Sequence, residues 1–291
     1  MPRTRRKIQA ELKDAEAKLN AMKYLGSTVT SSQGLPSDQR YFLLGVDGHG
    51  LGTSILAKGN PDTAKNIATF VPGTGSNLAG ISGGKVRSDR MFQAATRAGS
   101  GETSVITWQG YHAPQNIPQA ASTSYADNGK AAFDNFQQGL RATHQGPPSH
   151  DVAIGHSYGT TLIGHAARDG NVASNDLVFV ASPGVGVDSA SQLHVAPDHV
   201  YATEATNDII HATNPTIPGT RLPRPADIAM LGPDPTNPTF GGQTFDSAPG
   251  APGPWYTGGL NAEVHSQYWD PKNPSLINMA DIIAGKQPTA H

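Results

Sequence analysis

The sequence predicts an α/β fold with a mostly parallel central sheet that is covered by helices on both faces. From residue 41 to residue 204, short apolar segments alternate with segments of helical periodicity. Apolar segments such as Ile67–Val71 and Leu177–Val180 are almost continuous, as expected for strands buried on both faces. The chain has 291 residues, 36% of them hydrophobic, which suits one large domain with a short appendage.

The appendage is predicted to be an amphipathic helix from about Arg5 to Tyr24. Apolar residues recur there at helical spacing between charged residues, at Ile8, Leu12, Ala15, Leu19 and Met22. Such a helix needs a surface to pack on, either the main domain or a partner. The stretch Gly26–Pro36 is rich in Ser, Thr and Gly and is expected to be a linker. We therefore divide the chain into a helix with linker at 1–35 and a main domain at 36–291.

The main domain is expected to begin with a strand pair at the sheet edge, Tyr41–Val46 and Ser54–Ala57. Further strands are expected at Ile67–Val71, Ser104–Trp108, Asp151–Gly155, Leu177–Val180 and His199–Glu204, and helices at Ser88–Ala98, Ala126–Thr143, Ser157–Arg168 and Ser275–Ile283. The pattern stops from about Asp208 to Glu263, where Pro and Gly are frequent. A loop of this length is typically functional or disordered, and as a functional loop this one is expected to cover a pocket.

Composition excludes several classes of protein. The net charge of −2 gives no global basic field for nucleic acid or an anionic membrane. The chain has no cysteine, which excludes disulfides, thiolate metal sites and a cysteine nucleophile. The basic start, Met1 to Arg6, is followed by charged residues, and no apolar run reaches transmembrane length. We expect a soluble protein without signal peptide, either cytoplasmic or exported without a leader.

The segment Gly155-His156-Ser157-Tyr158-Gly159 matches G-x-S-x-G. In a nucleophile elbow, a sharp strand-to-helix turn holds the serine in a strained backbone conformation, and the glycines let neighbouring backbone approach. The predicted strand before Ser157 and the predicted helix after it supply the context that the motif requires. Ser157 is therefore predicted to be a nucleophile.

A serine nucleophile in this setting is followed in the chain by an acid and then by a histidine. Asp208 lies just beyond the predicted strand His199–Glu204 and is favoured as the acid, while Asp188 competes from a loop one strand earlier. Of the eleven histidines, His265 follows the acid at a suitable distance and precedes the final helix. We expect His265 to take the Ser157 proton and return it to the leaving group.

The oxyanion of the reaction is expected to bind two backbone N–H groups. One belongs to Tyr158, directly after the nucleophile, and the other to Thr74 in the loop Val71–Gly75, with Gly75 as the alternative. This loop does not match a nucleotide site, because Leu78 stands where a dinucleotide fingerprint needs glycine and Val86 follows Gly84-Lys85 where a Walker loop needs Ser or Thr. No cofactor and no metal site are predicted.

The sequence resembles the actinobacterial α/β hydrolases that were formerly grouped as a domain of unknown function. The resemblance runs from about Tyr41 to Ile283 and is carried by Gly59–Thr63, Val71–Gly75, Gly155–Thr160, Ser182–Val187, Gly232–Pro235 and His265–Asp270. It implies an α/β-hydrolase fold with Ser157 as nucleophile, Asp208 as acid and His265 as base.

These features predict a serine hydrolase that cleaves a small-molecule or lipid ester. An amidase or peptidase remains an alternative because the same three residues serve both chemistries. A second alternative is a hydrolase-like scaffold used for binding, in which the N-terminal helix meets a partner.

Overall fold

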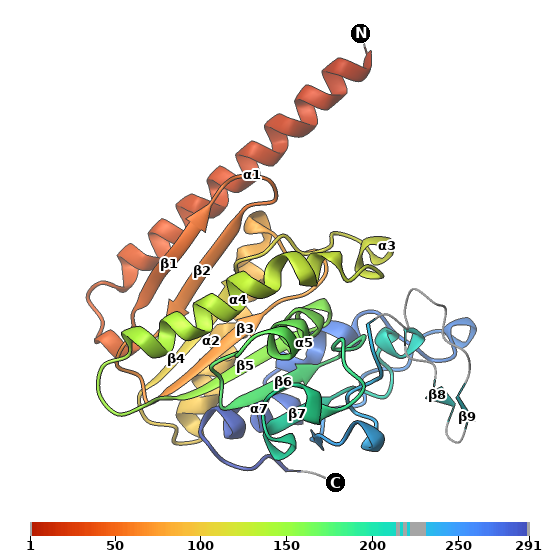
Figure 1. Ribbon diagram of the computed structural model, residues 1–291. Coiled ribbons are helices and arrows are strands. Elements are labelled where there is room, and N and C mark those ends of the chain that lie inside the picture. The colour runs from red at the N-terminus through yellow and green to blue at the C-terminus, as the bar shows by residue number, and fades with distance from the viewer. Residues whose placement is uncertain (1, 214–215, 218–219, 222–230, 290–291) are drawn as a thin grey trace.

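The computed structural model describes residues 2–213, 216–217, 220–221 and 231–289 (Figure 1). Its centre is an eight-stranded sheet with the strand order β1-β2-β4-β3-β5-β6-β7-β10. The strands are β1 (Tyr41–Asp47), β2 (Thr53–Lys58), β3 (Asn66–Val71), β4 (Thr103–Gln109), β5 (His150–His156), β6 (Asp176–Val180), β7 (Val200–Thr203) and β10 (Gln243–Thr244). β1 and β2 pair antiparallel at the edge, β2 meets β4 antiparallel, and the remaining pairs are parallel. The predicted fold class is confirmed.

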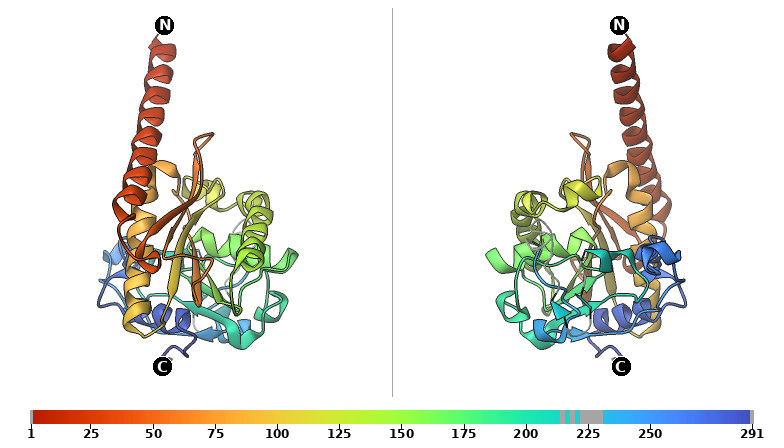
Figure 2. Two further views of the ribbon diagram at one scale, coloured as in Figure 1. Left: turned by 90° about the vertical axis from the view of Figure 1, so that its left-hand side faces the viewer. Right: turned by 90° about the vertical axis from the view of Figure 1, so that its right-hand side faces the viewer.

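Helices cover both faces of this sheet (Figure 2). They are α2 (Ile81–Arg97), α3 (Ile117–Ala120), α4 (Ser124–Thr143), α5 (Tyr158–Asp169) and α7 (Pro274–Ile283). Alternate residues of β3 face opposite layers, as strand geometry requires. Ile67 belongs to the core cluster that contains residues of α4 and α5, and Phe70 to the one that contains residues of α2 and α7.

The N-terminal helix α1 (Pro2–Ser32) is longer than predicted, because it continues past Tyr24 through most of the expected linker. Leu25 and Ala21 are buried against Leu56 and Ile81 of the main domain, and this packing holds the second half of the helix. The first half projects away from the domain in Figures 1 and 2, and Ile8 is 59% exposed. Packing on the main domain thus accounts for one half of the helix only.

The remaining connections contain several short elements. Among the described residues they include a separate strand pair, β8 (Thr216–Ile217) with β9 (Thr220–Arg221), and the 3₁₀ helices η1 (Ser37–Gln39), η2 (Leu78–Gly80), η3 (Ala190–Gln192), η4 (Pro197–His199), η5 (Ile209–Ala212), η6 (Pro238–Phe240), η7 (Trp255–Thr257) and η8 (Val264–Trp269). The Pro-rich region therefore contains β10, which the sequence did not predict, while its residues 214–215, 218–219 and 222–230 lie outside the described part of the chain. No helix among the described residues is long and apolar enough to cross a bilayer.

The turn from β5 to α5 is packed so closely that its glycines have no room for a side chain. A Cβ at Gly159 would lie 2.2 Å from the Val71 carbonyl oxygen, and one at Gly155 would lie 2.7 Å from the Thr160 Cα. Both obstacles are backbone atoms, which a rotamer change cannot move aside. Gly159 therefore lets the first turn of α5 approach the end of β3, and Gly155 lets the end of β5 approach the same turn.

We expect Gly159→Ala to lower the free energy of unfolding by about 1–3 kcal/mol, because the added methyl group overpacks against backbone. Gly139→Ala is the matched control: Gly139 lies on the exposed face of α4 and has no neighbouring atom within 4 Å of the added Cβ. That variant is expected to gain about 0.4–1 kcal/mol through reduced freedom of the unfolded chain. Urea denaturation of both variants measures the difference, and equal effects of the two substitutions would contradict this packing.

Candidate active site

Ser157 stands at the turn between β5 and α5 with a backbone that few non-glycine residues adopt. Its φ is 54° and its ψ is −130°, and α5 begins at the next residue, Tyr158. The Ser157 N–H donates to the Val180 carbonyl of the neighbouring strand at 3.0 Å. Only 8% of the residue is exposed. This is the strained strand-to-helix geometry that a nucleophile elbow requires.

Asp208 and His265 lie in direct contact although 57 positions separate them in the chain. The His265 Nδ1 is 2.9 Å from Asp208 Oδ1 and 3.1 Å from Oδ2. A carboxylate only accepts, so Nδ1 carries the proton and Nε2 keeps its lone pair. The structure thus brings together the predicted acid and the predicted histidine, whereas the competing Asp188 is exposed and donates its N–H to Gln192.

The Asp208 carboxylate is completely buried and receives further hydrogen bonds. The Ile210 N–H donates to Oδ1 at 2.9 Å, and the Tyr268 hydroxyl donates to Oδ2 at 2.6 Å. Tyr268 is itself held by the Ala205 N–H at 2.8 Å. Burial, and then the charge of Asp208, raise the pKa of Tyr268, so its hydroxyl stays a donor. These contacts offset the cost of burying the carboxylate and fix its orientation towards His265.

Ser157 and His265 line one cavity of about 410 Å³. The described contacts include no direct hydrogen bond between Ser157 Oγ and the His265 ring. Such bonds are often long in a free enzyme and tighten when substrate binds. The cavity is also lined by Ile209 and Ile210, so the described start of the Pro-rich region does border the site.

The loop after β3 packs against the serine turn. A Cβ at Gly73 would lie 2.7 Å from the Tyr158 nitrogen, so the two backbones nearly touch. Tyr158, as the first residue of α5, has no intrahelical acceptor for its N–H. The Gly75 N–H donates to the Pro114 carbonyl at 2.7 Å, which removes Gly75 as an oxyanion donor. Of the two predicted alternatives, Thr74 is therefore the one that remains compatible with the structure, and it lines the cavity.

A second cavity of about 110 Å³ adjoins the first, and Ser157, Thr74 and Ile210 line both. It is almost entirely apolar and is lined by Ala120, Ala121, Tyr158, Pro183 and Leu231, among others. His265 lines only the first cavity. The serine thus borders both a larger cavity that contains the histidine and a smaller, more apolar cavity that does not.

The sequence did not single out three residues beside this site. His156 Nε2 donates to the His265 carbonyl at 2.8 Å, and its Nδ1 is 3.3 Å from Arg87 Nη1, whose N–H it accepts. The Arg87 guanidinium also lies 4.8 Å from the Trp269 ring centre. Burial, and then the charges of Arg87 and His265, lower the pKa of His156 well below its usual value. His156 is therefore neutral and supports the main chain of His265.

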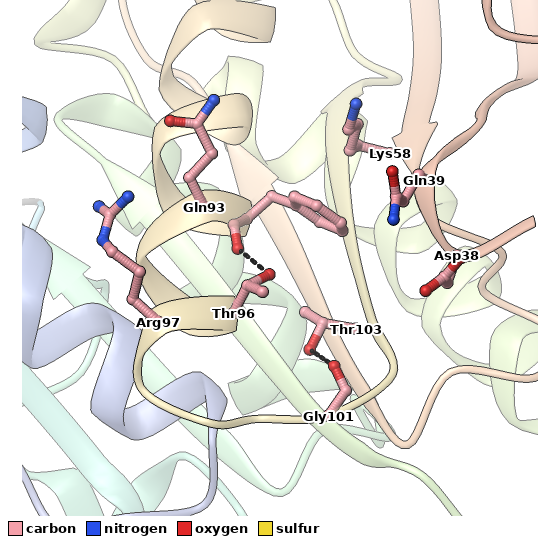
Figure 3. Close-up of a pocket in the computed structure, with 9 residues that line it drawn as sticks. Asp38, Gln39, Lys58, Gln93, Thr96, Arg97, Gly101 and Thr103 are labelled. Atoms are coloured by element: carbon pink, nitrogen blue, oxygen red, sulfur yellow. Dashed lines mark hydrogen bonds between the residues drawn. The ribbon is translucent and has the colours of Figure 1, made fainter. Parts of the chain in front are cut away.

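Another cavity, of about 330 Å³, lies away from this site (Figure 3). It is lined by Lys58, Arg97 and Thr103, among others, and Thr103 begins β4. Because β4 and β5 are both parallel to β3, the amino end of β4 and the carboxyl end of β5 lie at opposite edges of the sheet. Ser157 stands at the second of these edges, where α/β proteins usually bind their ligands. This cavity contains none of the predicted site residues. Among the described residues, no group of three or more His, Asp or Glu is placed to hold a metal ion.

Comparison with known proteins identifies the family to which this chain belongs. The sequence profile of a family described as alpha/beta hydrolase matches residues 47–218. An uncharacterized protein of Mycobacterium tuberculosis strain H37Rv is 32% identical in an alignment of 253 residues that covers 81% of this chain and 37% of that protein. This chain thus spans well under half of the length of that curated relative.

Solved structures give a weaker likeness. A structure of a protein called FAE has a TM-score of 0.45 and 15% identity, covering 81% of this chain and 88% of that one. A serine hydrolase without lid from Xanthomonas campestris has a TM-score of 0.36 and 18% identity, covering 60% and 75% of the two chains. At such scores, the family assignment depends on the sequence matches.

The neutral state of His156 predicts a specific loss of stability in acid. Because the pKa of His156 is lower in the folded than in the unfolded protein, the unfolded state takes up the proton first as the pH falls below about 6.5. We expect the free energy of unfolding to decline there, with a contribution from this ring of up to about 1.4 kcal/mol per pH unit.

The amide of His156→Gln can also donate to His265 and accept from Arg87. We expect the free energy of unfolding of this variant to decline less steeply than that of wild type between about pH 7 and pH 5. Denaturant titrations at several pH values compare it with wild type and with His112→Gln, a change at an exposed histidine. Identical slopes for wild type and His156→Gln would show that His156 is not held neutral.

Proposed function

Since this chain belongs to the α/β-hydrolase family, we propose that it is a serine hydrolase that cleaves a carboxylic ester through an acyl-enzyme. The observation that carries the proposal is the buried Asp208 bound to His265 Nδ1, with His265 lining the same cavity as Ser157. The proposed catalytic residues are Ser157, His265 and Asp208.

In the first half of the reaction, Ser157 Oγ attacks the ester carbonyl carbon and gives its proton to His265 Nε2. The Thr74 and Tyr158 N–H groups receive the negative charge that develops on the carbonyl oxygen. The bond to the alcohol oxygen then breaks, and His265 returns the proton to that oxygen. Asp208 keeps the imidazole in the tautomer that can accept and stabilises its charged form.

In the second half, a water molecule gives a proton to His265 and attacks the acyl carbon. The bond to Ser157 Oγ breaks, Oγ recovers the proton, and the carboxylic acid leaves. Each half returns His265 to its starting protonation state, and the second half also restores the Ser157 hydroxyl. No cofactor is required for this sequence of steps.

The shape of the site favours a short acyl group. The apolar cavity holds about 110 Å³, roughly a quarter of the 410 Å³ of the cavity that contains His265. Its lining is suited to an alkyl chain. Because His265 must protonate the leaving group, the alcohol part belongs in the larger cavity. A short-chain ester therefore fits better than a long lipid ester.

The finer assignments follow the same proposal. We place the chain with the actinobacterial hydrolases formerly of unknown function, and mycobacterial relatives such as the one above support this. We also keep the division into an appendage at 1–35 and a hydrolase domain at 36–291. The exposed first half of α1 supports a partner for that helix.

We expect Ser157→Ala and His265→Ala to lower kcat/KM for 4-nitrophenyl acetate by about 10⁴-fold or more, and Asp208→Asn by about 10⁴-fold. Ser191→Ala, at an exposed serine, is the control and is expected to match wild type. Initial rates of nitrophenolate release measure all four variants. Retention of full activity in a folded Ser157→Ala variant would refute the proposal.

The same assay separates the ester from the amide alternative. We expect 4-nitrophenyl acetate to be cleaved and 4-nitroacetanilide to be cleaved far more slowly, because nitrophenolate is a much better leaving group than the anilide nitrogen. Comparable kcat/KM values for the two compounds would favour an amidase. Binding of esters without any turnover would favour the scaffold.

A further inference from the structure

Arg87 projects from α2 into the larger cavity beside Ser157 and His265. Its guanidinium has five N–H donors. One reaches His156 Nδ1 at 3.3 Å and another reaches the Ser266 hydroxyl at 3.4 Å, both long hydrogen bonds to neutral acceptors. Three donors therefore have no acceptor among the described residues.

No described acidic side chain pairs with this cation. The ion pairs of the described residues leave Arg87 out, although its neighbour Arg90, one turn along α2, is paired with Asp270 at 3.0 Å. Burial, followed by repulsion from Arg90, lowers the pKa of Arg87. The face of Trp269 offers the guanidinium some compensation. A partly buried cation without a counter-charge is costly unless something else supplies that charge.

The described lining of the cavity contains no Asp or Glu, and Arg87 is the one Arg or Lys in it. Arg87 is therefore the permanently charged side chain in the described lining of this cavity. Arg87 also bonds to Ser266, directly after His265, and does not line the apolar cavity. The cation thus lies on the side where the alcohol part of an ester leaves.

We propose that Arg87 binds an anionic group, a carboxylate or a phosphate, on the alcohol part of the ester substrate. The inference rests on the proposed hydrolase reaction and names its substrate class: a short, uncharged acyl group esterified to an alcohol that carries a negative charge. The free guanidinium donors match the paired oxygens of such an anion. When the ester is cleaved, Ser157 retains the acyl group and the anionic alcohol leaves past Arg87.

Two matched esters test this preference. The alcohol part of 4-acetoxybenzoate carries a carboxylate, and that of 4-acetoxybenzamide is neutral and of nearly the same shape. The measured quantity is the ratio of kcat/KM for the anionic to that for the neutral ester, which cancels most differences in intrinsic reactivity when variants are compared. We expect Arg87→Gln to lower this ratio by about 10- to 100-fold.

Two more variants control for charge and folding. Arg90→Gln removes a positive charge from the same helix and is expected to keep the wild-type ratio within about twofold, because surface charges contribute little. Arg87→Lys keeps the charge without the forked geometry, and its ratio of kcat/KM values is expected to lie between those of wild type and Arg87→Gln. If Arg87 serves only to position His156 and His265, Arg87→Gln will slow both esters equally, and the unchanged ratio will overturn the proposal.

A binding readout keeps this inference separate from turnover. A fluorophosphonate probe reports whether Ser157 is reactive, and 4-hydroxybenzoate is expected to slow labelling of wild type but not of Arg87→Gln, while 4-hydroxybenzamide slows neither. If 4-hydroxybenzoate does not change the labelling rate of wild type, the proposed anion site is refuted, whereas the proposed hydrolase reaction is not. Absence of labelling in folded wild type overturns both.

Discussion

The strained backbone of Ser157 is the constraint on which the rest of the site depends. A residue with φ of 54° at a strand end persists only where its surroundings fix it. Here Gly155 and Gly159 allow contacts that no side chain would permit, and the Val180 carbonyl holds the Ser157 N–H. The same close packing brings the loop after β3 next to the Tyr158 nitrogen, so one turn positions both the nucleophile and the groups proposed to bind the oxyanion.

The histidine side of the site is organised by buried polar contacts. Asp208 is held by Tyr268 and the Ile210 N–H, and it sets the tautomer of His265. On the other side, His156 supports the His265 carbonyl and in turn accepts from Arg87. Arg87 thus links the main chain of the proposed base to the cavity, where its unpaired donors give the proposed substrate preference.

Much of the fold was predictable because its strands are buried on both faces and separated by amphipathic helices. The strands β3 to β7 lie close to their expected positions. Helix α1 was predicted too short, since Gly26 and the Ser and Thr residues after it suggested a linker, while burial of Leu25 and packing of Val29 keep the chain helical. Strand β10 has two residues and forms by pairing with β7, so no local sequence pattern predicted it.

At the site, motif and chain order predicted residues that the structure brings to one cavity or its wall. Gly75 could not be excluded from sequence, because its N–H is occupied by Pro114, 39 positions away. The roles of Arg87, His156 and Tyr268 were not predicted for a similar reason, because they depend on contacts between segments that are far apart in the chain. Arg87 reaches Ser266, which is 179 positions away, and nothing in the sequence around α2 reveals that contact.

The most direct test of the central claim is the site of covalent labelling by a fluorophosphonate, found by peptide mass spectrometry of the full chain. Our account predicts one phosphonylated residue, Ser157, with labelling abolished by His265→Ala in a folded protein. A modification elsewhere, or a Ser157 that stays unmodified while the protein is folded, would contradict it.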